Sequence, residues 1–452
     1  MSKQKRQLHL NLFLMNVGHH EAAWRYKGTR PERITDLRYY QELARAAESA
    51  KFDSIFLADG LAVNRHIKHG AFVGLEPFTL LSALAAVTER IGLIGTVSTT
   101  YNEPYHVARK FASLDHISNG RAGWNIVTSG SVFEANNFNR DTHPEHHKRY
   151  ERAAEFLEVT TGLWDSWRDD ALVVDRESGV FADPDKVQPI GHAGEHFQVR
   201  GPLNIPRPPQ GYPVLVQAGS SEDGKAFAAR YAEAIFTAQQ TLEEAQLFYS
   251  DVKARLLRYG RTPDQLKILP GICPVIGATE SEAREKEQEI NELTVPEYGL
   301  NQLSNMLGVD LYTYPLDGPL PELPSLDEIN GNKSRFQLVI DLAQREHLTI
   351  RQLLHRLAGG RGHRTYAGTA VQIADQLEEW FQGGGADGFN VMPPYLPRGL
   401  EEFAAGVIPE LQRRGLFRTE YSGTTLRGHL GLERPAHPAQ VEGLGRNIAV
   451  NG

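Results

Sequence analysis

Cysteine is almost absent from this chain of 452 residues, in which Cys273 is the single example. One cysteine cannot form an intrachain disulfide, and it cannot supply the several thiolates of a cysteine-based metal site. Cys273 lies in an apolar run that is typical of a strand, so we expect a buried packing residue. A cytoplasmic location is the simplest interpretation.

Long apolar runs and an excess of positive charge are also missing. No apolar run reaches about 18 residues, the length that a membrane-spanning helix requires, and the first residues lack the apolar core of a signal peptide. The formal charge is -8 and no basic block stands out, which argues against nucleic acid as a partner. The length suits one large α/β domain with insertions, or two domains.

Short apolar runs alternate with amphipathic segments along most of the chain. Eight runs have the length and composition of buried strands, and each is followed sooner or later by a helical pattern. Such alternation indicates a parallel sheet, and eight units favour a closed (β/α)8 barrel of the TIM type. An open doubly wound sheet is the main alternative, which the absence of a GxGxxG motif after the first strand weakens. The eight runs are 8–15, 52–58, 91–97, 120–127, 213–218, 234–236, 268–276 and 388–392.

Two stretches interrupt the alternation. Residues 168–212 are rich in Pro, Gly and Asp and predict an irregular or hairpin excursion, whereas 294–368 is a candidate lid with a hinge at 359–362. The tail, 418–452, is polar and Gly-rich, so we expect it to wrap a neighbour or to be loosely held. We predict a single domain over 1–452 with these two insertions.

Polar residues follow four consecutive strands, at the point where each strand ends. A barrel keeps its site at the C-terminal ends of its strands, so we predict that these side chains line one site. They are Asp59, Thr96, Ser98, Asn125, Ser129, Ser220 and Ser221.

Ser221 belongs to a Gly-rich run, 219–224, that opens a helix. The free N–H groups and the positive end of the helix dipole make this position a possible anion site. Ser221 also fits a simple N-cap followed by an acidic first turn. The local sequence favours the cap, because a barrel's phosphate site more often follows its seventh and eighth strands.

Several histidines are candidates for chemistry. His146 and Tyr150 lie four residues apart at the start of a predicted helix, so the imidazole and the phenol can face one ligand. The neighbouring histidines lack a third ligand at an obvious position, and we expect no metal. His19 and His20 lie on the loop after the first strand, where a catalytic role and a surface role are both open.

Aromatic and apolar side chains near the same strand ends have two interpretations. Most would be core in any barrel, but some could form the floor under a flat aromatic ligand, and periodicity does not separate the two. These residues are Phe13, Met15, Phe56, Trp124 and Phe389.

Six runs carry a resemblance to a known family. They are FDSIFLADGLAV, the long run from LEPFTLLSALAAVTERIGLIG to SNGRAGWNIVTS, EHHKRYERAAEFLEV, GPLNIPRPPQGYPVLVQAGSS, ADGFNVMP and GLFRTEYSGTTLRGHLGL. The sequence resembles the bacterial-luciferase-like flavin monooxygenases, in the arm that holds nitrilotriacetate, EDTA and dibenzothiophene-sulfone monooxygenases. The likeness covers nearly the whole chain.

The resemblance implies a TIM-like barrel that binds reduced FMN, which a separate NAD(P)H:flavin reductase supplies. The implied FMN contacts are Asp59, Thr96, His146, Tyr150 and Ser221. The phosphate would then sit at Ser221, which reverses the preference for a simple cap. We add Asn125 and Ser220 to the cofactor site from their positions at strand ends.

The resemblance also implies a catalytic group, since His19 matches a histidine proposed as catalytic in the sulfone enzyme. At Glu21, and near Met306, this sequence differs from the sulfone enzyme. The substrate of that enzyme is therefore not inferred for this chain. We expect His19 or His20 to manage protons. Arg25 and Arg361 are either surface charges or holders of an anionic substrate group.

The expected function is a two-component monooxygenase that uses reduced FMN and O2 to oxygenate a small organic substrate, with cleavage of a C–N or C–S bond. The substrate would be a xenobiotic, a sulfone or an aminopolycarboxylate. The family suggests a homodimer or homotetramer. Two alternatives are a deazaflavin-dependent hydride-transfer enzyme on the same barrel and a flavin-binding protein without turnover.

Overall fold

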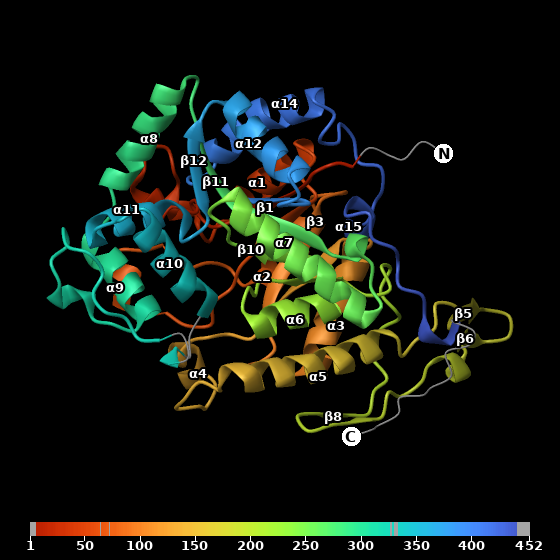
Figure 1. Ribbon diagram of the computed structural model, residues 1–452. Helices are drawn as coiled ribbons and strands as arrows, with labels where there is room; N and C mark the ends of the chain where they lie inside the picture. The colour runs from red at the N-terminus through yellow and green to blue at the C-terminus, as the bar shows by residue number, and fades with distance from the viewer. Residues whose placement is uncertain (1–5, 64, 72, 326–327, 330–332, 441–452) are drawn as a thin grey trace.

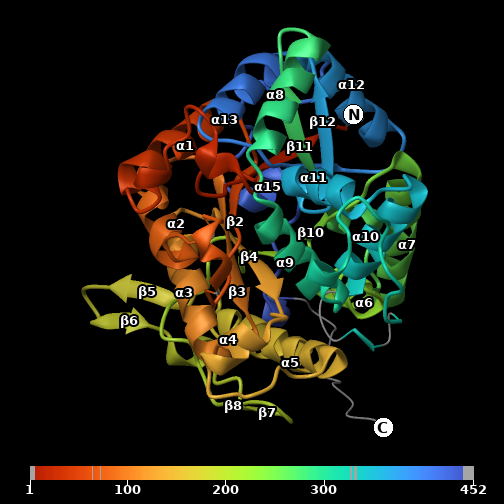
Figure 2. The same ribbon diagram turned by 90° about the vertical axis from the view of Figure 1, so that its left-hand side faces the viewer.

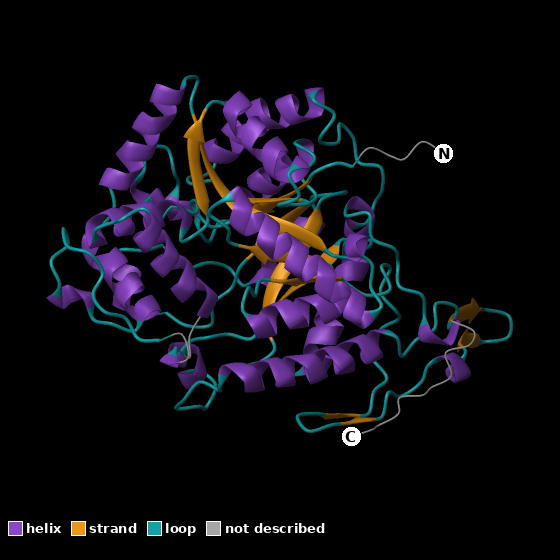
Figure 3. Cartoon of the chain, viewed as in Figure 1, coloured by secondary structure: helices purple, strands orange, loops and turns teal. Residues whose placement is uncertain are grey.

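A computed structural model describes residues 6–440 of the chain, apart from 64, 72, 326–327 and 330–332. Strands occupy the centre of the molecule and helices surround them (Figures 1 and 3). No helix among the residues described is both long enough and apolar enough to pass through a membrane.

Eight parallel strands close into a barrel, which confirms the predicted fold. Each strand pairs with the next in the order β1, β2, β3, β4, β9, β10, β11 and β13, and β13 pairs with β1 to close the ring. All eight are strands that the sequence predicted. They are β1 (His9–Phe13), β2 (Ser54–Leu57), β3 (Gly92–Ser98), β4 (Ala122–Val127), β9 (Val214–Gln217), β10 (Ala234–Thr237), β11 (Lys267–Ile276) and β13 (Gly388–Val391).

Helices cover the outside of the barrel. Several begin at a side-chain cap, as at Thr241 and Thr369, whose hydroxyls and the side chains three residues later form capping boxes. The helices are α1 (Leu37–Ser49), α2 (Pro77–Ala85), α3 (Pro104–Ile117), α4 (Val132–Asn136), α5 (His146–Trp164), α6 (Glu222–Tyr231), α7 (Leu242–Leu256), α8 (Glu280–Glu292), α12 (Ala370–Gln382), α13 (Arg398–Glu402) and α14 (Ile408–Arg413).

The first insertion forms two short antiparallel hairpins, which project away from the barrel (Figure 1). One hairpin pairs β5 (Leu172–Asp175) with β6 (Val180–Ala182), and the other pairs β7 (His192–Ala193) with β8 (Gln198–Val199).

The second insertion is more regular than the sequence predicted. It contains α9 (Pro296–Leu307), α10 (Lys333–Arg345) and α11 (Ile350–Gly360), followed by a ninth parallel strand, β12 (Arg364–Gly368), on the second half of β11. Of these elements, the sequence pattern predicts only a helix over 335–346, which corresponds to α10. The three helices lie together in both views (Figures 1 and 2) and enclose an apolar cluster of their own.

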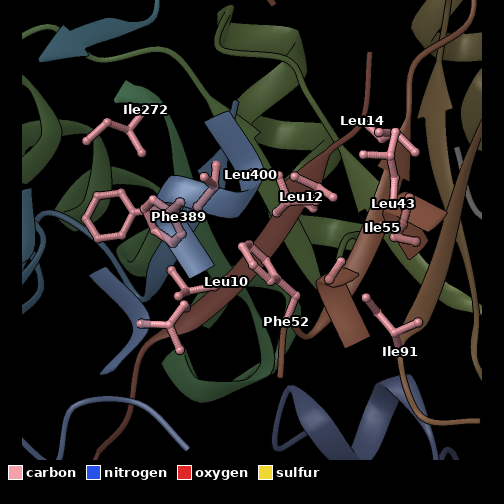
Figure 4. Close-up of a cluster of buried hydrophobic side chains, with 14 of the residues drawn as sticks. Leu10, Leu12, Leu14, Leu43, Phe52, Ile55, Ile91, Ile272, Phe389 and Leu400 are labelled. Carbon is pink, nitrogen blue, oxygen red and sulfur yellow. The ribbon is translucent and has the colours of Figure 1, made fainter. Parts of the chain in front are cut away.

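Alternate residues of the barrel strands pack on its two sides. Leu10, Leu12 and Ile55 face outward into a cluster with the surrounding helices (Figure 4). Phe13 and Phe56 point inward instead and meet Phe236 of β10. Of the five aromatic and apolar residues singled out in the sequence, Phe13, Met15 and Phe56 belong to the inner cluster, whereas Trp124 and Phe389 pack outside.

The C-terminal segment corrects one prediction. Residues 418–440 are not loosely held, because the short helix α15 (Leu426–His429) closes the N-terminal end of the barrel. Leu426 and Leu430 are fully buried in the inner cluster. Arg427 donates to Glu233 Oε2 at 3.0 Å, just before β10. Gly and polar residues hid this role, since the apolar contact comes from Leu426, Leu430 and the partly buried Leu432 within a polar run. The rest of the tail, 441–452, lies outside the described residues.

Candidate cofactor and active site

The ends of β2, β3 and β4 are tied together at the mouth of the barrel. Thr96 Oγ1 donates to the carbonyl of Leu57 at 2.7 Å, and Asn125 Nδ2 donates to Thr96 Oγ1 at 2.8 Å. Both side chains are buried, and the described residues offer no partner to Asn125 Oδ1. A buried acceptor of this kind calls for a donor from a ligand or water. Asp59 stands exposed on the loop that follows β2.

The start of α6 forms a cradle of backbone after β9. Ser221 caps the helix, and its Oγ accepts from Gly224 N at 3.2 Å. A Cβ on Gly219 would lie 2.3 Å from Gln217 Nε2, and one on Gly224 would lie 2.9 Å from the Gly219 carbonyl carbon. The backbone of Gly219 therefore leaves no room for a side chain at Gly224. The cap and the anion site predicted at Ser221 are compatible, because the other N–H groups of the first turn remain for a ligand.

His146 and Tyr150 face this cradle from the first turns of α5, which lies beside α6 (Figure 1). Their ring centroids are 5.1 Å apart, as expected for positions i and i+4. His146 Nδ1 lies 3.0 Å from Asp223 Oδ2. Burial raises the pKa of Tyr150, and hydrogen bonds with Ser221 and Gln217 oppose that shift.

One cavity of about 280 Å³ brings these groups together. His146, Tyr150 and Ser221 line it, so three of the predicted contacts converge. Arg149 is a further lining residue, which donates to the carbonyl of Ser129 and brings a buried positive charge. The sequence analysis missed Arg149 and Gln217, although Gln217 is the last residue of β9 and the strand-end rule could have found it.

Ser220 faces a different space from its neighbour Ser221. Its Oγ lies 3.1 Å from Thr237 Oγ1, and it lines a larger cavity of about 740 Å³ between β9, β10, α7 and α10. Thr237 ends β10 at the same edge of the barrel. The two adjacent serines thus line different cavities on the two sides of one loop.

Three phenylalanines and two histidines form the floor of the barrel mouth. Phe13, Phe56 and Phe236 meet edge to face, with centroids 4.9 to 5.8 Å apart. His19 leans on Phe13 at 5.4 Å, and His363 stacks on Phe236 at 4.7 Å with an angle of 8° between the rings. The floor is therefore aromatic throughout, with imidazole nitrogens at two places.

The two histidines of the floor are held neutral. Burial, together with the nearby charges of Arg361 and Arg335, lowers the pKa of His19 well below its usual value. The pKa of His363 is lowered in the same way, and its Nε2 accepts from Arg335 Nη2 at 2.6 Å. His19 Nε2 has no partner among the residues described. His363 and Arg335 lie in the second insertion, far from any predicted strand end, so no sequence signal pointed to them.

His20 points away from His19. Its Nε2 lies 3.0 Å from Asn291 Oδ1 of α8, and its Nδ1 accepts from Ala22 N at 3.1 Å. Burial lowers its pKa to about 4. Arg25 also turns from the mouth, because its exposed guanidinium donates to the carbonyl of Leu293. The loop after β1 therefore presents one of its two histidines to the floor.

The acidic, histidine and cysteine side chains of the described residues form no group of three that could hold a metal ion. Cys273 is buried in the inner cluster, where burial raises the pKa of its thiol. This placement confirms the prediction that it is a packing residue.

Comparisons with known proteins identify relatives over almost the full length. The family model for luciferase-like monooxygenases matches residues 13–388. N-acetyl-S-(2-succino)cysteine monooxygenase of Bacillus subtilis is 52% identical, over 97% of this chain and 99% of that protein. Nitrilotriacetate monooxygenase component A of Aminobacter aminovorans is 53% identical, over 95% and 97%. A crystal structure of riboflavin lyase with modified FMN and riboflavin superposes with a TM-score of 0.85 at 32% identity, covering 95% of this chain and 96% of that one.

Proposed function

The chain belongs to the luciferase-like monooxygenase family and is a flavin-dependent monooxygenase, and we propose that it binds reduced FMN at the barrel mouth. With O2 it would oxygenate a small organic substrate and cleave a C–N or C–S bond. One relative is named as component A of its system, and we propose a separate NAD(P)H:flavin reductase as the partner here. A homodimer or homotetramer is part of the same proposal.

The glycine cradle at the start of α6 carries the proposal for FMN. A phosphate there would receive N–H groups of the first turn and the Ser221 hydroxyl. Tyr150 and His146 face the same cavity, and Arg149 supplies positive charge at its wall. A phosphate is dianionic near neutral pH, so a buried guanidinium and a helix N-terminus are matched to it.

The flavin ring is assigned to the aromatic floor. From the cradle, Asp59, Thr96 and Asn125 extend around the rim on β2, β3 and β4, where polar groups could meet the edge of a flat ring. The unpartnered Asn125 Oδ1 supports this placement, because it can accept from a ring N–H. Ser220 lies at the other side of the cradle, and we propose that it contacts the part of FMN that links the phosphate to the ring.

His19 is our proposed proton-handling group. It is the histidine of the first loop that reaches the floor, and its neutral imidazole can accept or donate a proton at Nε2. His20 shares the proposed catalytic assignment only as a positioning residue, because its two ring nitrogens are engaged by Asn291 and Ala22. Reduced FMN, when bound, supplies the electrons that activate O2 for insertion.

Exclusion of water is the proposed task of the second insertion. Helices α9, α10 and α11 cover one side of the mouth, and Arg335 of α10 reaches the floor at His363. Covering a reactive site prevents side reactions with solvent. We propose that this insertion acts as a lid.

An anaerobic titration tests the cofactor. We expect reduced FMN to bind more tightly than reduced riboflavin, which lacks the phosphate, and than a reduced deazaflavin. Tighter deazaflavin binding would support the hydride-transfer alternative instead. Oxygen uptake is then measured with nitrilotriacetate, an amine, and N-acetyl-S-(2-succino)cysteine, a thioether, as first substrates. If reduced FMN binds but no amine, thioether or sulfone couples O2 to an organic product, the protein binds flavin without turnover.

A further inference from the structure

A second cavity of about 280 Å³ lies above the mouth, between the loops after β1 and β2 and the insertion helices α9 and α11. It is separate from the cavity lined by His146, Tyr150 and Ser221, called the phosphate cavity below, and the two share no lining residue. Its wall is largely apolar. Leu303 and Met306 line it from α9, and Leu354 and Leu357 line it from α11.

Two residues bring formal charge to this cavity among its described lining residues, Glu21 and Arg361. Both are half-buried. A guanidinium has five N–H donors in a fixed fork, which matches the two oxygens of a carboxylate. Placed against an apolar wall, such a fork discriminates strongly between an anion and its neutral analogue.

The backbone of Arg361 has a defined conformation and a side-chain partner. The residue ends α11 in the left-handed conformation, with φ of 49°, and its carbonyl accepts from Arg335 Nη1 at 2.6 Å. Arg335 also binds His363, so one arginine holds both the cavity residue and the floor residue. A Cβ on Gly362, between them, would lie 2.5 Å from that guanidinium. The backbone of Arg361 is therefore held in place without a ligand.

Arg361 also connects the cavity to the proposed catalytic group. Arg335 binds both the Arg361 carbonyl and His363, and the ring centroid of His363 lies 6.1 Å from that of His19. The charge of Arg361 also contributes to the lowered pKa of His19, after burial. A ligand bound through Arg361 would thus extend its apolar part along α9 and α11 while its head lies beside the floor.

Glu21 sets the charge of the cavity. Burial raises the pKa of its carboxyl to about 7, and Arg361 opposes that shift. Near neutral pH the carboxyl is partly protonated, so the cavity carries between zero and one positive charge. This balance favours an anionic ligand over a cationic one.

We propose that this cavity is the substrate subsite and that it takes a small organic carboxylate, with the carboxylate on Arg361 and an apolar portion against Leu303, Met306 and Leu357. The assignment rests on the proposed monooxygenase function and narrows its substrate class.

Calorimetric titration of the FMN-loaded protein tests the assignment. The probes are phenylthioacetate, benzylthiosuccinate and N-benzyliminodiacetate, each paired with its neutral amide. We expect at least one acid to bind about tenfold or more tightly than its amide, the value of a charge-assisted hydrogen-bond pair. If no acid is preferred over its amide, the proposal is wrong.

Two variants locate the effect. Arg361→Gln should remove the preference for the acid and leave amide binding within about threefold, whereas Arg356→Gln, an exposed arginine on the same helix, should change neither. Glu21→Gln should strengthen acid binding at pH 8, because it removes the competing carboxylate. It provides an independent test if Arg361→Gln does not fold. Acid binding that is unchanged in both variants would overturn the assignment.

FMN titration of the same proteins separates this inference from the proposed function. Arg361→Gln should bind FMN like the wild type, since the phosphate cavity is elsewhere. If FMN binding is normal and the variants do not change the binding of the acids, the proposed subsite is wrong and the proposed function stands. A wild type that does not bind reduced FMN defeats the proposed function.

Discussion

His146 Nδ1 lies 3.0 Å from Asp223 Oδ2, and this contact joins the first turns of α5 and α6 at the edge of the phosphate cavity. The first residues of the two helices, His146 and Glu222, are 76 positions apart in the sequence. Two segments that begin at strand ends, one before and one after the first insertion, therefore line one cavity, to which we assign the phosphate of FMN. The contact also fixes the orientation of the imidazole that we assign to FMN.

Loss of His146 and Tyr150 should weaken FMN binding. The double variant His146→Ala/Tyr150→Ala removes two polar groups that face the cradle, and hydrogen bonds to a charged group contribute about 1.5–3 kcal/mol each. We expect at least a tenfold loss of affinity in a fluorescence titration. His147→Ala, whose side chain is 70% exposed on the same helix, is the matched control. Equal affinity in the double variant would remove both residues from the cofactor site.

Ser221 should distinguish FMN from riboflavin. Ser221→Ala removes a proposed phosphate donor as well as a helix cap, and a lost cap costs about 0.5–2 kcal/mol of stability. A pure cap effect would weaken FMN and riboflavin alike, whereas a phosphate contact lowers the FMN affinity alone. Thr369→Ala, which removes the cap of the distant helix α12, serves as control for stability. The assignment fails if the FMN-to-riboflavin ratio of affinities stays at its wild-type value.

His19 should affect product formation without a titration near pH 6.5. Burial lowers its pKa well below that value, so the imidazole stays neutral from pH 6 to 8 and no protonation step of His19 falls in that window. We expect His19→Ala, measured at saturating reduced FMN because the residue is also part of the floor, to form less product per O2 consumed. A ratio of product to O2 equal to wild type at every pH would exclude the proposed proton-handling role.

Binding of a carboxylate substrate should weaken as the pH rises through about 7. Burial raises the Glu21 pKa to about 7. Below it the carboxyl is neutral and Arg361 meets the ligand alone; above it the Glu21 carboxylate competes. The other titratable groups around Arg361 are Tyr298, Cys273, Arg335 and the histidines whose pKa values are lowered, His19, His20 and His363. The apparent affinity is measured between pH 6 and 8.5.

The control for this pH effect is Glu21→Gln, which cannot ionise. Its affinity for the acid should be flat over the same range, while the wild type loses affinity on the alkaline side. A wild-type profile that is flat, or one that rises with pH, would show that Glu21 does not set the charge of the subsite.

Residues of α15 should matter for stability although they are far from the mouth. Leu426→Ala and Leu430→Ala each remove a fully buried side chain from the inner cluster, and such changes cost about 2–5 kcal/mol. We expect a clear shift of the denaturation midpoint in urea. Leu257→Ala, 68% exposed, should shift it little. Variants that unfold with the wild-type midpoint would mean that the barrel does not need this segment.

The barrel could be predicted from the sequence because its strands are continuous apolar runs. Buried parallel strands carry this signal themselves, as in the run that becomes β3. β12 gave no such signal, since four of its five residues are only half-buried. The helix α11 was missed because its glycines, at positions 359 and 360, stand at its end and read as a hinge. The prediction for the tail was wrong for a related reason. A few leucines within a polar run do not produce a recognisable apolar periodicity.

The candidate site was predictable where it follows strand ends or helical spacing. Asn125 and Thr96 satisfy the first rule, and His146 with Tyr150 satisfies the second. His363 satisfies neither, because an insertion carries it to the floor and the stacking on Phe236 holds it there. The choice between His19 and His20 also needed coordinates, since adjacent residues on a loop point to different sides.

The seal formed by α15 has a consequence for biosynthesis. Leu426 and Leu430, which close the barrel interior, are translated after every barrel strand. The chain emerges from the ribosome at about 5–20 residues per second. All eight strands are therefore made while the N-terminal end of the barrel is still open, and it closes only when these leucines appear. Completion of the barrel therefore waits for a segment that follows all of its strands, and the unsealed barrel is the form that chaperones would meet.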